Sequence, residues 1–68
     1  MPEAWTGRLV GKMHNAQITQ QDMATEMNCT KAYVSMILNG ARKPNGARER
    51  FEAAFDAVKK KREENLDG

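Results

Sequence analysis

Residues 20–40 read QQDMATEMNCTKAYVSMILNG, and the spacing of the apolar residues in this stretch decides the fold. Two apolar sets recur at intervals of three and four residues, one before and one after a break at residues 27–30. The first set is Ile18, Met23, Ala24 and Met27, and the second is Val34, Ile37 and Leu38. The pattern predicts two short helices, each with one face to bury, joined by a tight turn.

The residues around the break have the preferences that a turn between two helices requires. Asn28 tolerates the left-handed backbone conformation that ends a helix, and the Thr30 hydroxyl can cap the helix that follows. Thr19 and Asp22, three positions apart, form a capping-box pair, with the acid well placed for the helix dipole. We therefore expect the first helix of the pair to start near Gln20.

The second helix of the pair also has a clear end. Asn39 and Gly40 are a common helix stop, and Pro44 prevents simple continuation, so this helix is predicted over about residues 31–39. In the first helix, the small side chain of Ala24 is what a close crossing of the two helices requires.

Two further helices are predicted, one on each side of this pair. The first is predicted over residues 3–15 from the apolar residues Trp5, Leu9, Val10 and Met13. The second is predicted over residues 46–64 from an apolar stripe made of Ala47, Phe51, Ala54, Phe55 and Val58. Gly7 and Gly11 either weaken the first helix or allow close packing against it. No strand-like alternation is long enough to propose a sheet, so we expect an all-α, compact four- to five-helix domain over residues 1–68.

The end of the last predicted helix is almost entirely charged. Residues 59–64 read KKKREE, and the last seven or so residues have little apolar surface to dock, so we expect them to fray. We interpret Lys59–Arg62 as a solvated helix end in preference to a DNA contact, because two acids follow immediately.

Length and composition exclude several kinds of site. A domain of 68 residues buries only about 60% of its unfolded surface, so the core must be small. One cysteine rules out an internal disulfide, and one histidine adds no metal-ligand cluster, so we expect no metal or cofactor. We interpret Cys29 as a small apolar core residue and His14 as an exposed residue at a helix end. No apolar run approaches the roughly 20 residues of a membrane span, and we expect a cytoplasmic protein.

The net charge of +2 is unevenly distributed along the chain. Residues 28–50 carry five Lys or Arg and one acid, a net charge of +4, whereas residues 1–27 and 51–68 each have a net charge of −1. Positive charge is therefore concentrated on the second helix of the pair and the loop after it, where it could meet a phosphate backbone.

The outward side of the second helix holds the candidate base-reading residues, which are Thr30, Lys31, Ala32, Ser35 and Met36. In a DNA major groove, Lys31 can donate to guanine and Ser35 can hydrogen-bond a base or a phosphate. Ala32 and Met36 can pack against thymine methyl groups.

A second set of residues is expected to contact phosphates: Gln20, Tyr33, Asn39, Arg42 and Lys43. Gln20 opens a helix, where backbone amides also favour anions, and Arg42 and Lys43 lie in the basic loop. Tyr33 lies partly toward the core, although its hydroxyl can reach outward.

The chain resembles the lambda-repressor-like, Cro/cI-type helix-turn-helix proteins, also called the XRE family, over about residues 5–58. The matching features are Gln20 opening a helix, the small Ala24, the buried positions Val34 and Ile37, the Asn39–Gly40 stop, and the basic loop ending at Pro44. Asn28 stands where the family usually has glycine in the turn.

The resemblance implies a function as well as a fold. Gln20 and Asn39 correspond to positions that contact the DNA backbone, and Lys31, Ala32 and Met36 to positions that read bases. Members of the family are mostly dimeric transcription regulators of phages, mobile elements and bacterial chromosomes, bound to near-palindromic operators. The expected partners are thus double-stranded DNA and a second copy of the chain, with no small-molecule ligand.

Dimerisation has a candidate surface on the last helix. Phe51, Phe55 and Val58 share one stripe, and a core of this size need not bury all of it. The alternative interpretation is that both phenylalanines close the core over the helix pair.

Two other classes of function are also compatible with the sequence. The same fold could serve as a protein-interaction module, for example in an antitoxin or an element-control protein, which the low net charge and the apolar Ala32 and Met36 favour. An enzyme is the weakest interpretation, because no pair of carboxylates and no Cys/His or Ser/His set accompanies an enclosing pocket.

Overall fold

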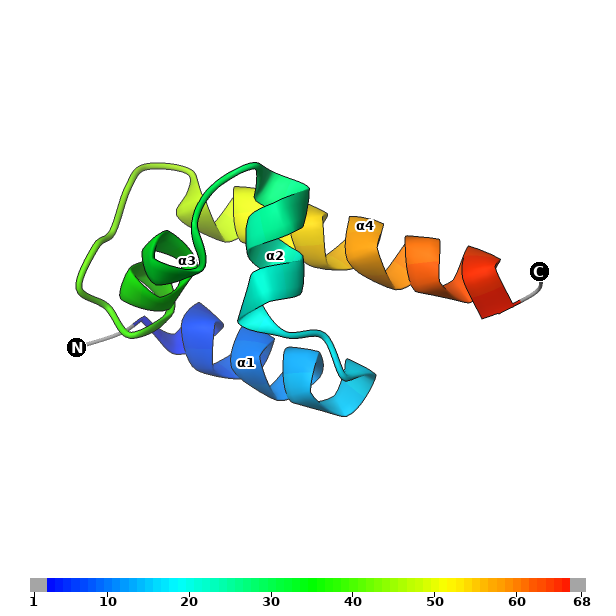
Figure 1. The fold of residues 1–68 in the computed structure, drawn as a ribbon. Coiled ribbons are helices and arrows are strands. Elements are labelled where there is room, and N and C mark those ends of the chain that lie inside the picture. The colour runs from blue at the N-terminus through cyan, green and yellow to red at the C-terminus, as the bar shows by residue number, and fades with distance from the viewer. Residues whose placement is uncertain (1–2, 67–68) are drawn as a thin grey trace.

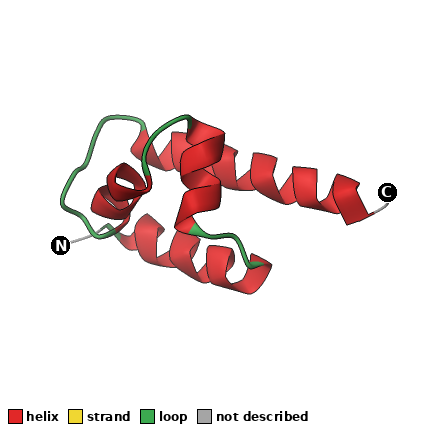
Figure 2. Cartoon of the chain, in the orientation of Figure 1, coloured by secondary structure: helices red, strands yellow, loops and turns green. Residues whose placement is uncertain are grey.

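The computed structural model describes residues 3–66 and contains, in this range, four helices and no strand (Figures 1 and 2). The helices are α1 (Ala4–Ala16), α2 (Gln20–Met27), α3 (Lys31–Leu38) and α4 (Ala47–Leu66). The prediction of an all-helical fold is confirmed, and each boundary lies within two residues of the predicted one.

The four helices pack around one core, with α4 as the longest element. α2 packs against both α3 and α4, and α1 also contacts α3 and α4. The C-terminal end of α4 extends beyond the other helices (Figure 1), which gives the described chain a length of 41 Å against widths of 21 and 18 Å. None of the helices described here is long and apolar enough to cross a membrane.

The contact between α2 and α3 is part of this core. Met23, Ala24 and Val34 are completely buried, which agrees with a tightly packed position for the small Ala24. Beneath them, the ring of Phe51 is 1% exposed and meets the ring of Trp5 edge to face, with 5.8 Å between centroids. Because Ala24 is completely buried, a larger side chain at position 24 would have to displace its neighbours.

The predicted helix signals act as expected. The Thr19 hydroxyl accepts from the Asp22 backbone N–H at 3.1 Å, and the Thr19 N–H donates to the Asp22 carboxylate at 2.9 Å, a complete capping box. Asn28 ends α2 in the left-handed conformation with φ 56°, and the Thr30 hydroxyl accepts from the Tyr33 N–H at 3.1 Å. These bonds set where α2 begins and where α3 restarts.

The stripe on α4 that was expected to offer a dimer surface lies inside the single chain. Phe51, Phe55 and Val58 are 1%, 3% and 8% exposed. The reason is that α1 covers the phenylalanines, with Trp5 against Phe51 and the Lys12 ammonium 5.2 Å from the centre of the Phe55 ring. The expectation of an exposed stripe is wrong, and the alternative, that both phenylalanines close the core, agrees with their burial.

Of the last seven or so residues, which were expected to fray, residues 62–66 belong to α4, which continues to Leu66, and residues 67 and 68 lie outside the described part of the chain. Polar contacts anchor this end where apolar ones are scarce. The Lys61 ammonium lies 2.6 Å from Glu26, and the Arg62 guanidinium lies 2.7 Å from Asp22. Both partners are on α2, so the charged end of α4 is bound to the helix pair.

Two glycines of α1 provide a test of local stability. Gly7 and Gly11 are exposed, and a Cβ at either position would meet nothing within 4 Å, so close packing is not their role. Gly7→Ala and Gly11→Ala should each raise the free energy of unfolding by about 0.5 to 1 kcal/mol, because alanine loses less backbone entropy in a helix. Urea denaturation measures the change.

The matched control is Gly46→Ala, where a Cβ would also meet nothing within 4 Å but the backbone has φ +76°. This variant should be destabilised by about 1 kcal/mol, because an L residue is strained in that conformation. A change of the same sign in the free energy of unfolding of all three variants would contradict the explanation by backbone conformation.

Candidate nucleic-acid interface

The outward side of α3 is defined by the residues that α3 buries. Val34, Ile37 and Leu38 are 0%, 2% and 7% exposed, so the helix can be rotated in only one way against the core. This rotation leaves Lys31 and Ala32 exposed at the first turn. The exposed surface of α3 therefore begins with one cation beside a small apolar side chain.

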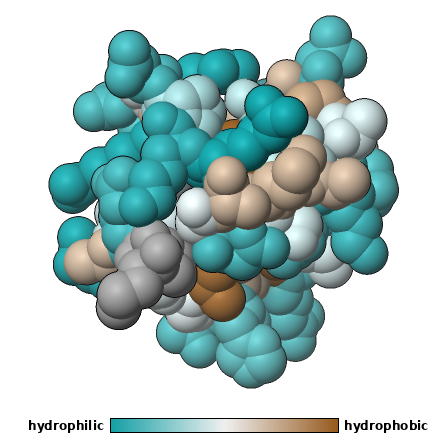
Figure 3. All heavy atoms as spheres, turned by 90° about the vertical axis from the view of Figure 1, so that its left-hand side faces the viewer, coloured by the Kyte–Doolittle hydropathy of each residue, from teal (hydrophilic) through white to brown (hydrophobic). Residues whose placement is uncertain are grey.

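The other predicted base-reading residues are less accessible or are already engaged. Ser35 and Met36 are half-buried, and the Thr30 hydroxyl oxygen caps α3 by accepting from Tyr33. The capping bond uses Thr30 as an acceptor and leaves its O–H to donate. The side of the molecule that carries α3 and the loop after it has moderately apolar side chains among hydrophilic ones (Figure 3).

The loop from α3 to α4 is held in shape by hydrogen bonds to the end of α3. The Asn39 side-chain oxygen accepts from the Ala41 N–H at 3.1 Å, and the Arg42 N–H donates to the Met36 carbonyl at 3.1 Å. Gly40 supplies the turn with φ 86°. With its oxygen engaged, Asn39 presents its amide NH₂ as the group that could donate to a phosphate.

The basic side chains of this loop are exposed beside a shallow hollow of about 310 Å³. Arg42, Lys43 and Arg48 line it together with the acids Glu3 and Glu49. The hollow has mixed charge, and Arg42 and Lys43 form its basic side. Arg42, Lys43 and Arg48 are all exposed, so an extended anionic strand could reach them from solvent.

The predicted site residues lie in two places. Nine of the ten fall on one continuous segment, residues 30–43, which comprises the α3 cap, α3 and the following loop. Gln20 is separate in sequence and opens α2, where it is half-buried beside the Thr19 cap. Tyr33 is half-buried and packs against the core, as its intermediate position in the helix pattern predicts.

Comparison of the chain with family models, curated proteins and solved structures finds no match. Across the described residues, no three His, Cys, Asp or Glu side chains are grouped so that they could hold a metal ion.

Sequence reasoning missed one part of this region, the polar network at the start of α2. Asp22 accepts from the Thr19 N–H at 2.9 Å and from the Arg62 guanidinium at 2.7 Å, both through Oδ2. The Thr19 backbone bond is the main reason that the pKa of Asp22 lies below its ordinary value; partial burial opposes it, while the Thr19 side chain and the Arg62 charge add to the lowering. The capping box was visible in the sequence, but a partner 40 residues away was not.

The lowered pKa of Asp22 predicts how stability changes with acid. The folded protein holds this carboxylate ionised more strongly than the unfolded chain does, so its contribution to stability is complete above the ordinary pKa of 3.8 and is lost as the pH falls through the lower pKa of the folded state. Asp22→Asn should therefore be less stable than the natural protein at neutral pH, and the difference should narrow on acidification.

Urea denaturation over a pH series measures this difference. Arg62→Met is the comparison variant, and it should retain more of the acid dependence than Asp22→Asn, because the Thr19 bond is the larger cause of the shift. A difference between Asp22→Asn and the natural protein that stays constant across the series would contradict the assignment.

Proposed function

We propose that this chain is a small DNA-binding transcriptional regulator of the lambda-repressor-like type, in which α2 and α3 form a helix-turn-helix and α3 enters the major groove. The observation that carries the proposal is the α2–α3 pair itself. Two eight-residue helices meet across Asn28–Thr30, and the exposed start of the second helix is followed by a basic loop. A short, rigidly held helix of this kind fits a major groove about 12 Å wide.

In this proposal the residues of α3 read bases through mixed chemistry. Lys31 donates to guanine, Ser35 hydrogen-bonds a base edge, and Thr30 donates through its hydroxyl at the edge of the groove. Ala32 and Met36 pack against thymine methyl groups. With so few polar readers, part of the specificity would come from DNA shape.

Phosphate contacts would hold the helix in register. Gln20 and the backbone amides at the start of α2 would bind phosphates on one side of the groove. On the other side, phosphates would be bound by Asn39, Arg42 and Lys43, and the Tyr33 hydroxyl would be a further donor. No cofactor and no catalytic group is required. The protein would act in the cytoplasm as a homodimer on a near-palindromic operator, with half-sites about one helical turn apart.

Selection from a random double-stranded DNA library tests the proposal directly. The expected result is an enriched inverted repeat, bound with an affinity whose logarithm falls linearly with the logarithm of salt concentration. The slope should be close to −0.9 for each phosphate contacted. Absence of both enrichment and salt-sensitive binding would overturn DNA binding.

The second candidate is a protein-interaction module, which the low net charge and the apolar Ala32 and Met36 favour. The structure adds Val10 on α1, a large hydrophobic residue with 45% of its surface accessible. An apolar protein interface responds weakly to salt, so the same titration separates the two candidates.

Two substitutions distinguish base reading from phosphate contact on the selected operator. Lys31→Ala should weaken binding by about 1 to 3 kcal/mol and relax the preference at one base position. Arg42→Ala should weaken all sequences similarly and reduce the salt slope by about one. Fluorescence anisotropy on the operator and on single-base variants measures both effects.

Lys60→Ala is the control, because Lys60 is an exposed cation on α4, which carries none of the residues proposed to contact DNA. It should leave the base preference unchanged and affect affinity only slightly. An equal loss on every sequence for Lys31→Ala would identify Lys31 as a phosphate contact instead.

A further inference from the structure

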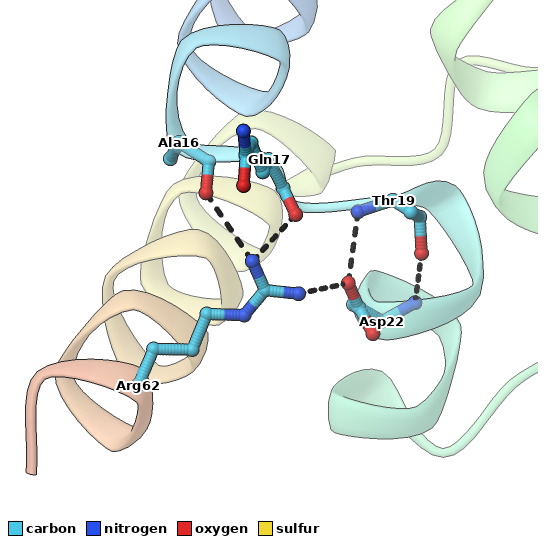
Figure 4. A network of polar contacts seen from close by, with 5 residues as sticks. All are labelled: Ala16, Gln17, Thr19, Asp22 and Arg62. Carbon is cyan, nitrogen blue, oxygen red and sulfur yellow. Dashed lines mark hydrogen bonds and ion pairs between the residues drawn. The ribbon is translucent and has the colours of Figure 1, made fainter. Parts of the chain in front are cut away.

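The Arg62 side chain reaches from the far end of α4 into the junction between α1 and α2 (Figure 4). Its Nη1 donates to the carbonyl of Ala16, at 3.2 Å, and to the carbonyl of Gln17, while its Nη2 donates to Asp22 Oδ2 at 2.7 Å. One guanidinium thus connects three segments that are separate in sequence. The planar fork of arginine allows this, and a lysine ammonium could not reproduce it.

The two carbonyls lie where α1 ends. Ala16 is the last residue of α1, and Gln17 follows it in the left-handed conformation with φ 58°. The final carbonyls of a helix carry partial negative charge and lack partners within the helix. Arg62 supplies both a partner and a positive charge at this helix end, and so holds the turn that leads into α2.

The carboxylate lies where α2 begins. Asp22 is the third residue of α2, two positions after Gln20, the residue proposed to contact a phosphate. An unneutralised carboxylate at this end would repel a DNA phosphate, although the helix terminus itself attracts anions. The ion pair with Arg62 offsets that repulsion, and the two side chains are 42% and 35% exposed, so the pair remains close to solvent.

We propose that Arg62 is a positioning residue for DNA binding, which holds the α1–α2 turn and neutralises Asp22 so that the start of α2 can receive a backbone phosphate. The proposal rests on the proposed function. Arg62 acts through Asp22 and the turn and makes no phosphate contact of its own. The charged end of α4 thereby contributes to the interface from outside the helix pair.

The neighbouring residue offers a matched control. Lys61 pairs with Glu26 at 2.6 Å, also between α4 and α2, but Glu26 lies near the opposite end of α2. Lys61→Met therefore removes one positive charge and one ion pair between the same two helices without touching the start of α2. Any effect specific to Arg62→Met must come from the α1–α2 junction.

The test compares Arg62→Met, Lys61→Met and the double variant Arg62→Met/Asp22→Asn on DNA enriched by selection with the natural protein, at two salt concentrations. Arg62→Met should weaken binding by about tenfold, with the salt slope unchanged. The double variant should recover part of the loss, because asparagine keeps the acceptor for Thr19 and removes the charge. Lys61→Met should stay within about twofold of the natural protein.

Amide hydrogen exchange gives a readout that does not depend on DNA. In Arg62→Met the amides of residues 18–22 should exchange faster, while those of the core residues Val34 and Phe51 should not change. The exchange at residues 18–22 tests whether Arg62 holds the α1–α2 turn, and the exchange of the core amides shows whether the variant is folded.

Three results would overturn the proposal. A fall of about 0.9 in the salt slope for Arg62→Met would make Arg62 a direct phosphate contact. An equal loss for Lys61→Met would reduce the effect to overall charge. Unchanged amide exchange at residues 18–22, with no recovery of affinity in the double variant, would show that Arg62 has no positioning role. Failure of the natural protein itself to bind DNA would instead overturn the proposed function. In that case the exchange experiment alone would test whether Arg62 holds the α1–α2 turn.

Discussion

The orientation of α3 depends on the buried contact between α2 and α3. Ala24 on α2 and Val34 on α3 are both completely buried, so a larger side chain at position 24 would have to displace its neighbours. The left-handed Asn28 and the Thr30 cap then allow only a short path between the helices. Because α3 has only eight residues, its stability must come from this packing, since an isolated helix of that length is marginal in water.

Helix ends carry most of the specific polar interactions in this small protein. Thr19 and Asp22 cap the start of α2, Thr30 caps the start of α3, and Arg62 binds the last carbonyls of α1. A domain of this size has a small core, so hydrogen bonds to the backbone groups at its helix ends contribute a large share of its stability. The same termini lie beside the surfaces proposed to meet phosphates.

The proposed interface separates two electrostatic tasks. Positive charge on Lys31, Arg42 and Lys43 is exposed and available to an anionic partner. The positive charge of Arg62 is instead paired within the protein, where it neutralises the Asp22 carboxylate. Overall net charge is thus a poor measure of how this protein would meet DNA, because local placement decides which charges a phosphate encounters.

Local signals in the sequence determined the helical fold, the helix boundaries and the α3 surface, because caps, left-handed turn residues and apolar spacing act over three or four residues. Only the tertiary structure decided that Phe55 is buried and which groups Arg62 binds. Whether α1 covers Phe55 depends on how helices distant in sequence pack, and Arg62 finds Asp22 across 40 residues. Periodicity shows which face of a helix is apolar, but what covers that face, and where a long charged side chain ends, follows from packing in three dimensions.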